Sequence, residues 1–388
     1  MILTNKQEEA LKIAVARYKA GEPWTCISGY AGTGKSTLVN FIIAALGLNP
    51  SDEVAYVTFT GKAATVLQNK GCPNATTAHR LLYYSKLLPN GKFIFTPRPR
   101  LENKFLKLIV VDEISMLPVQ LWELLLSHKI HIIACGDPFQ LPPINKDTDN
   151  HVLNKPHIFL DQIMRQAAES EIIRISMDIR EGNPLSYFHG QEVRIIPEHE
   201  IVDGIYTWAD QIICATNKTR LEINNFMRAA AKRGPEPEVG DKIICCRNDW
   251  DTTDINLGNS LVNGTIGIIS DLQFDEIKYP IPNIPSVPSI ICNLSTSANE
   301  EFNKLIIDKK ALTTGEKTLT PQQEYRLKEF IKPLEFNYGY AITCHRAQGS
   351  QWDKILVVEE KFPFAKEEHA RWLYTAVTRA VDKLILVR

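Results

Sequence analysis

The glycine-rich segment at residues 29–37, GYAGTGKST, carries the clearest chemical signal in the sequence. It matches the pattern G-x-x-x-x-G-K-[ST], in which glycines let the backbone wrap a phosphate and helix N-terminal amides point toward it. In this pattern the Lys35 side chain reaches the outer phosphates and the Ser36 hydroxyl is a ligand of Mg²⁺. The segment predicts a nucleotide site that comprises Gly29, Gly32, Thr33, Gly34, Lys35, Ser36 and Thr37.

Two further segments carry polar groups that such a site can use. Asp112 and Glu113 directly follow the apolar run at residues 108–111, so Asp112 is expected to hold the metal through water and Glu113 to polarise an attacking water. Gln140 lies in the segment CGDPFQLPP at residues 135–143, where an amide can sense the γ-phosphate. An Asp-Glu pair after an apolar run is common on its own, and its combination with the glycine-rich loop favours catalysis. The alternative for Gln140 is a solvated amide in a proline-rich loop.

Short, continuous apolar runs are the elements expected to position these residues. Such runs are typical of parallel strands that helices cover on both faces. They predict an α/β domain over residues 1–155, with an amphipathic helix at 4–20 and a second helix at 36–46. The strands are expected at residues 24–28, 54–58, 108–111 and 131–135.

The rest of the chain predicts a second α/β domain over residues 156–388, with strands at 211–215, 354–358 and 384–387. A Pro-Asn-Gly turn signal at residues 89–91 indicates a small hairpin insertion at about 81–104. Strand-and-turn sequence and clustered prolines indicate a β-rich insertion at about 240–332.

Composition excludes several classes of protein. The net charge of −1 argues against a binder that relies on a general basic surface, so any nucleic-acid site must be a local groove. The eight cysteines include no C-x-x-C pair, which argues against a zinc ribbon. Neither a signal peptide nor an apolar run of membrane-spanning length is evident, so a soluble, cytoplasmic protein is expected.

The motifs together, in this order, resemble those of superfamily 1 helicases, most of all the RecD/Dda-like branch. They are GYAGTGKST, TFTGKAA, TAHR, VVDEISM, GDPFQLPP, LDQIMRQ, TCHRAQGSQ and YTAVTRA. The resemblance spans nearly the whole chain and implies two RecA-like domains that use ATP and Mg²⁺. It also implies a DNA helicase that translocates 5′ to 3′ on single-stranded DNA.

The resemblance assigns further residues to the nucleotide site. Arg165 in LDQIMRQ and Arg379 in YTAVTRA match family arginines that reach the γ-phosphate, where a guanidinium stabilises the charge of the transition state. A surface ion pair is the alternative for each. Gly349 lies in the motif TCHRAQGSQ. Gln7 matches the glutamine that reads adenine, although Thr4 and Gln7 also form a capping-box pattern.

The same resemblance places nucleic-acid contacts at the starts of loops and helices. Hydroxyls, imidazoles and amides at such places contact the phosphate backbone without reading sequence. The alternative for His79 is a structural histidine and for Lys62 a solvated lysine. The candidates are Thr60, Lys62, Thr77, His79, Thr343 and His345.

The expected protein is therefore a monomeric, ATP-hydrolysing motor on single-stranded and tailed duplex DNA, with replication or recombination proteins as candidate partners. Several alternatives stay open. They are an RNA-directed helicase of the same superfamily, a nucleic-acid-stimulated ATPase that does not unwind, a small-molecule P-loop kinase, and a nucleic-acid clamp that uses nucleotide only as a switch.

Overall fold

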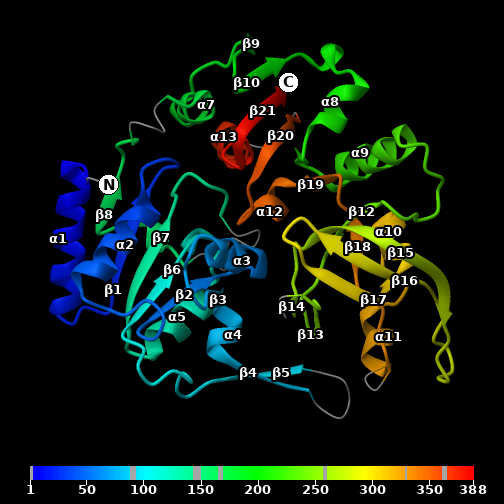
Figure 1. Cartoon of the computed structure of the whole chain (residues 1–388), viewed down its shortest axis with the longest axis horizontal. Helices are drawn as coiled ribbons and strands as arrows, with labels where there is room; N and C mark the ends of the chain where they lie inside the picture. The colour runs from blue at the N-terminus through cyan, green and yellow to red at the C-terminus, as the bar shows by residue number, and fades with distance from the viewer. Residues whose placement is uncertain are drawn as a thin grey trace. The chain divides into compact units, whose positions relative to one another are not determined.

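The computed structural model forms two compact units, shown in sequence colours in Figure 1. It describes residues 3–87, 93–142, 150–164, 169–256, 260–327, 330–360 and 365–388. Unit 1 contains Met1–Tyr84, Thr96–Glu200 and Gln348–Arg388, and unit 2 contains Ser85–Phe95 and Ile201–Ala347. None of the helices in the described ranges has the length and apolar character that crossing a bilayer requires.

A six-stranded parallel sheet is the framework of the first half of unit 1. Its order is β3-β2-β6-β7-β1-β8. The strands are β1 (Trp24–Gly29), β2 (Val54–Thr58), β3 (Thr76–Thr77), β6 (Leu108–Val111), β7 (His131–Gly136) and β8 (Ile158–Leu160). The four strands that the apolar runs predicted are all present, and their ends agree within one residue.

Both faces of this sheet are buried because alternate side chains of each strand enter different cores. Leu108 and Val110 pack with α1 (Asn5–Lys19), α2 (Lys35–Ala45) and α3 (Gly61–Asn69) on one face. Ile109 and Val111 pack on the other face with α4 (Ala78–Leu82), η1 (Ile114–Met116), α5 (Val119–Ser127) and η3 (Val152–Asn154). This two-sided burial explains why the strands are continuously apolar in sequence.

Unit 1 also contains parallel strands from the second half of the chain. β10 (Val193–Ile196) and β20 (Trp352–Val358) both pair parallel with β21 (Ala380–Val387), and β9 (Phe188–His189) adds an antiparallel edge. The accompanying helices are α7 (Glu171–Glu181), η4 (Glu198–Glu200) and α13 (Lys366–Val377).

Unit 2 combines a small α/β part with an antiparallel sheet. β11 (Gln211–Cys214) pairs parallel with β19 (Ala341–Thr343), accompanied by α8 (Asp203–Trp208), α9 (Asn217–Ala230) and α12 (Cys344–Ala347). The expected α/β class is confirmed by the parallel strands in both halves of the chain. The expected division at residue 155 stays a prediction, although it would separate β8 from β1, with which β8 pairs.

The β-rich insertion is the five-stranded sheet of unit 2, in the order β17-β16-β15-β12-β18. Its strands are β12 (Lys242–Cys245), β15 (Ile266–Ile277), β16 (Val287–Thr296), β17 (Glu301–Asp308) and β18 (Phe336–Tyr338). It is accompanied by β13 (Asp249–Thr253), β14 (Ser260–Leu261), α10 (Lys309–Thr314) and α11 (Pro321–Arg326). The sheet also includes β18, which pairs antiparallel with β12 and lies beyond the expected end of the insertion at residue 332.

The small hairpin insertion corresponds to β4 (Tyr83–Leu87) and β5 (Phe93–Pro97), which form a two-stranded sheet. The Pro-Asn-Gly turn signal that predicted this insertion lies outside the described residues.

Candidate nucleotide-binding site

The glycine-rich loop joins the carboxyl end of β1 to the N-terminus of α2, as the sequence pattern requires. Gly32 and Gly34 have φ angles of +76° and +79°, which favour glycine. A Cβ atom at Gly29 would lie 2.8 Å from the carbonyl oxygen of Leu160 on β8, so this position must also lack a side chain. The backbone amides at the start of α2 are therefore presented around a concave loop that suits a phosphate.

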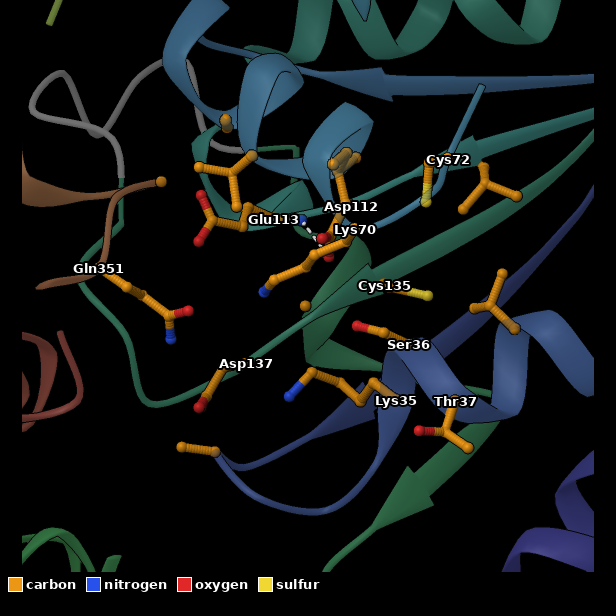
Figure 2. A pocket seen from close by; sticks show the side chains of 18 of the residues that line it. Lys35, Ser36, Thr37, Lys70, Cys72, Asp112, Glu113, Cys135, Asp137 and Gln351 are labelled. Carbon is orange, nitrogen blue, oxygen red and sulfur yellow. Dashed lines mark hydrogen bonds between the residues drawn. The ribbon is translucent and has the colours of Figure 1, made fainter. Parts of the chain in front are cut away.

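The loop forms one wall of a cavity of about 400 Å³ in unit 1. Gly32, Gly34, Lys35, Ser36 and Thr37 all line it, and Figure 2 shows the last three together with the carboxylates opposite. The Lys35 ammonium group donates to the carbonyl oxygens of Gly29 at 2.7 Å and Tyr30 at 2.9 Å. Thr33, in contrast, is buried, and its hydroxyl at 2.8 Å and its backbone amide at 3.4 Å both donate to the Tyr30 carbonyl oxygen, so its contact with a nucleotide stays a prediction.

Asp112 and Glu113 stand on the opposite wall, directly after β6 (Figure 2). Asp112 Oδ1 accepts a hydrogen bond from the Glu113 amide at 3.0 Å. Burial raises the pKa of Asp112, with partial compensation from that amide and from Lys35 and Lys70. The half-buried Asp112 carboxylate and the Ser36 hydroxyl beside a phosphate cradle are hard oxygen donors, so the residues present fit Mg²⁺.

Glu113 has a backbone conformation that is rare for a residue with a side chain, with φ of +52°. This turn places its carboxylate in the cavity, where burial raises the pKa of Glu113 and nearby Arg379 opposes the rise. Within the described part of the chain, the buried Oε2 atom has no hydrogen-bond partner. An unsatisfied buried acceptor beside a phosphate cradle is the arrangement expected of a group that holds a water molecule.

Arg379 approaches this carboxylate from the C-terminal end of α13, with its Nη1 atom 3.5 Å from Glu113 Oε1. Arg379 is only 3% exposed, and its Nε atom donates to the Thr375 carbonyl oxygen at 3.1 Å. This burial excludes the alternative of an exposed surface ion pair. Gly349 lies on the other side of Glu113, where an added Cβ would be 3.2 Å from Oε2.

Gln7 forms the capping box that the sequence pattern predicted and also contacts the glycine-rich loop. Thr4 and Gln7 form the capping box of α1, in which the Thr4 amide donates to Gln7 Oε1 at 3.1 Å. The same side chain donates through Nε2 to the Thr33 carbonyl oxygen at 3.2 Å, and it is 2% exposed. Gln7 therefore lies against the glycine-rich loop, while its role in reading adenine stays a prediction.

The remaining predicted residues of the site differ in what the structure shows. Gln140 lines the cavity, and its backbone amide donates to the Asp137 carbonyl oxygen at 3.4 Å. Arg165 lies outside the described residues, and its role stays a prediction. The segment before it contacts the loop, since the Met164 amide donates to the Gly32 carbonyl oxygen at 3.1 Å.

The structure adds residues to which the sequence assigned no role. Lys70, Asp137, Gln351 and Thr378 all line the cavity, and Figure 2 shows the first three. Asp137, Gln351 and Thr378 belong to the motifs GDPFQLPP, TCHRAQGSQ and YTAVTRA, and this membership could have indicated that they lie at the nucleotide site. Lys70 follows the end of α3 outside any of these motifs, so only the fold brings it to the cavity.

The candidate nucleic-acid residues of unit 1 gather at the carboxyl edge of the parallel sheet. Thr60 and Thr77 are the N-cap residues of α3 and α4, and their hydroxyls accept from the amides of Ala63 and Arg80, both at 3.3 Å. Lys62 is half-buried near the start of α3. His79 stacks on Tyr83 with ring centroids 6.0 Å apart, and burial lowers the pKa of its imidazole.

The two candidates of unit 2 lie on either side of a strand–helix junction. Thr343 ends β19 and His345 lies in the short helix α12. Burial lowers the pKa of His345, so both candidate histidines are neutral donors or acceptors at pH 7 rather than cations. All six contacts with nucleic acid stay predictions.

Comparison with known proteins agrees with this geometry. Residues 2–203 match the family described as AAA domain, and residues 338–387 match the UvrD-like helicase C-terminal domain. The chain belongs to this AAA-domain family. The expected resemblance to superfamily 1 helicases of the RecD/Dda-like branch is also confirmed.

Among curated proteins, the chain is similar to the ATP-dependent RecD2 DNA helicase of Deinococcus radiodurans, with 27% identity over 94% of this chain and 47% of the relative. It is also similar to the ATP-dependent DNA helicase dda of Enterobacteria phage T4, with 26% identity over 46% of this chain and 43% of the relative. The chain thus spans less than half of the length of each of these two relatives.

The fold is shared with Pif1 helicase from Bacteroides, crystallised in complex with ADP-AlF3 and single-stranded DNA. The TM-score is 0.55 at 18% identity, and the match covers 100% of this chain and 92% of that chain.

Proposed function

We propose that the chain is an ATP-driven motor that moves 5′ to 3′ along single-stranded DNA and separates duplex DNA ahead of it. The observation that carries this proposal is the convergence on one cavity of the glycine-rich loop, the Asp112–Glu113 pair and Arg379. A phosphate cradle, a carboxylate with one buried and unsatisfied oxygen, and a buried guanidinium together suit ATP hydrolysis.

Each group has a distinct part in this reaction. The loop amides and Lys35 bind the phosphates, while Ser36 and Asp112 would hold Mg²⁺, which neutralises phosphate charge when bound. Glu113 orients and deprotonates the attacking water. Arg379 stabilises the charge that spreads over the transferred phosphoryl group in the transition state.

Two features support a nucleic-acid motor over a P-loop kinase or a nucleotide-dependent clamp. Thr60 and Lys62 at the start of α3 lie at the same sheet edge as the cavity, which offers a route from strand binding to hydrolysis. The chain is also similar to proteins named DNA helicases and shares its fold with one crystallised with single-stranded DNA. An intact Glu113 favours hydrolysis over a switch.

The test has two parts, both with the full chain. ATPase rates are measured with single-stranded DNA, with single-stranded RNA and without nucleic acid, and we expect stimulation by DNA. Strand displacement is then compared on duplexes of equal length with a 5′ or a 3′ single-stranded tail, and we expect activity on the 5′-tailed substrate. Stimulation by RNA alone would point to an RNA-directed motor, and activity only on the 3′ tail would overturn the polarity.

A further inference from the structure

Tyr374 connects three segments of unit 1 that are remote in sequence. It lies in α13, is 1% exposed, and its hydroxyl donates to Asp137 Oδ2 at 2.6 Å. The Tyr374 hydroxyl oxygen also accepts a hydrogen bond from the Ala31 amide at 3.0 Å. Since Ala31 belongs to the glycine-rich loop and Asp137 follows β7, one phenolic oxygen joins that loop, the strand end and α13.

The segment after β7 is fastened to the C-terminal part of the chain at further points. The Leu141 amide donates to Thr375 Oγ1 at 2.9 Å, and the Leu141 carbonyl oxygen accepts from Gln348 Nε2 at 2.9 Å. Asp137 in turn orders its own segment, because its Oδ1 atom accepts from the Phe139 amide at 3.0 Å. Gln140, which lines the nucleotide cavity, therefore sits in a backbone segment held on both sides.

The same turn of α13 holds Arg379. The Thr378 hydroxyl donates to the Tyr374 carbonyl oxygen at 2.8 Å, and Arg379 Nε donates to the Thr375 carbonyl oxygen at 3.1 Å. A short path therefore runs from the glycine-rich loop through Tyr374 to the guanidinium that faces Glu113. A shift of α13 against the loop would move Arg379 relative to Glu113, because the Tyr374 and Thr375 carbonyl oxygens that hold Thr378 and Arg379 both belong to α13.

The two hydrogen bonds of the Tyr374 hydroxyl favour one position of α13 relative to the glycine-rich loop. Burial, with Asp137 adding to the effect, raises the pKa of Tyr374 far above its ordinary value, so the phenol stays a donor. A hydrogen bond from a hydroxyl to a buried carboxylate is stronger than one between neutral groups. If α13 moves away, the buried Asp137 carboxylate and the part-buried Ala31 amide each lose a partner, which penalises intermediate positions.

We propose that Tyr374 is a positioning residue for ATP hydrolysis, whose hydroxyl locks α13 to the glycine-rich loop and to Asp137 and thereby sets Arg379 against Glu113. The proposal rests on the proposed ATPase function. It assigns to Tyr374 no contact with the nucleotide. Its loss should therefore lower the rate of the chemical step without a comparable loss of ATP binding.

The experiment measures DNA-stimulated ATP hydrolysis by the full chain with Tyr374→Phe, which keeps the ring and removes both hydrogen bonds. We expect kcat to fall about tenfold, consistent with a lost charge-assisted hydrogen bond, while KM for ATP changes less than about twofold. Tyr18→Phe is the matched control, because the Tyr18 ring packs on His131 at the opposite end of β7. That control should leave kcat unchanged.

Asp137→Asn changes the acceptor of the Tyr374–Asp137 hydrogen bond, and it provides the test if Tyr374→Phe does not fold. It should lower kcat to a similar extent, and the double variant should be no more than about twofold slower than either single variant, since both disrupt the charge-assisted hydrogen bond between Tyr374 and Asp137. A kcat for Tyr374→Phe within twofold of the parent, a loss confined to KM, or multiplicative losses in the double variant would each overturn the proposal. Absence of ATPase activity in the parent chain would instead reject the proposed function.

Discussion

The nucleotide cavity and the candidate nucleic-acid edge, where Thr60, Lys62, Thr77 and His79 lie, use their polar side chains in opposite ways. In the cavity, Glu113 has a strained backbone and a buried carboxylate oxygen without a partner in the described residues. At the edge, the Thr60 and Thr77 hydroxyls are already engaged as helix N-caps. One region holds unsatisfied groups in place for a ligand, and the other uses groups that also stabilise the fold.

This difference indicates how substitutions should be interpreted in each region. Strain and unsatisfied burial persist only where the surrounding structure enforces them, so the cavity groups serve chemistry at the expense of stability. A cap residue contributes about 1 kcal/mol to its helix, so removing Thr60 or Thr77 would confound folding with binding. Tests at the nucleic-acid edge must therefore preserve the cap.

The largest effect is expected at Lys35. Lys35→Ala removes the one charged side chain of the glycine-rich loop, so ATP hydrolysis should be abolished while thermal unfolding and single-strand binding stay close to those of the parent. The measurement is the DNA-stimulated ATPase rate. Lys12→Ala, on the exposed face of α1, is the matched control. Near-normal turnover of Lys35→Ala would show that the loop does not bind the phosphates.

A smaller effect is expected for Arg379→Ala, at about 10³-fold in the hydrolysis rate with less change in ATP affinity. The pH dependence makes this prediction sharper. Glu113 acts as a base when deprotonated, so the rate falls as the pH drops through its pKa, which burial raises and Arg379 lowers. Removing Arg379 should shift the acid limb of the pH–rate profile to higher pH.

Arg379→Lys provides the control for charge. Lysine keeps the positive charge near Glu113, so the acid limb should move less than in Arg379→Ala. The rate should stay well below that of the parent, because a lysine lacks the planar fork of donors. An unchanged acid limb in Arg379→Ala, at a reduced rate, would contradict the assignment of Glu113 as the base.

The sequence predicted the elements of unit 1 well where local pattern determines them. β2 occupies exactly the run Val54–Thr58 that its apolar residues indicated, since two-sided burial leaves a continuous signal. The place of β8 was harder to predict. It has three residues, and only its pairing with β1 shows which sheet it joins.

Within the site, the predictable part was the set of motifs and the unpredictable part was the contacts between them. Tyr374 and Asp137 each lie in a recognised motif, but 237 positions separate them and neither periodicity nor spacing relates them. The left-handed backbone of Glu113 is equally invisible in sequence, because glutamate rarely adopts it. Both features arise from the tertiary fold.

The smallest effect is expected from Thr60→Asp, which separates the two roles of an N-cap. Aspartate caps as well as threonine and is favoured by the helix dipole, so the thermal stability should change little. A phosphate close to this position would be repelled by the new charge. Affinity for single-stranded DNA, measured without nucleotide at low salt, should fall about tenfold and the difference should shrink as salt screens it. Thr320→Asp, at the N-cap of α11 in unit 2, is the matched control and should leave affinity unchanged. Equal affinities for Thr60→Asp and the parent would leave Thr60 as a structural cap and remove it from the nucleic-acid contacts.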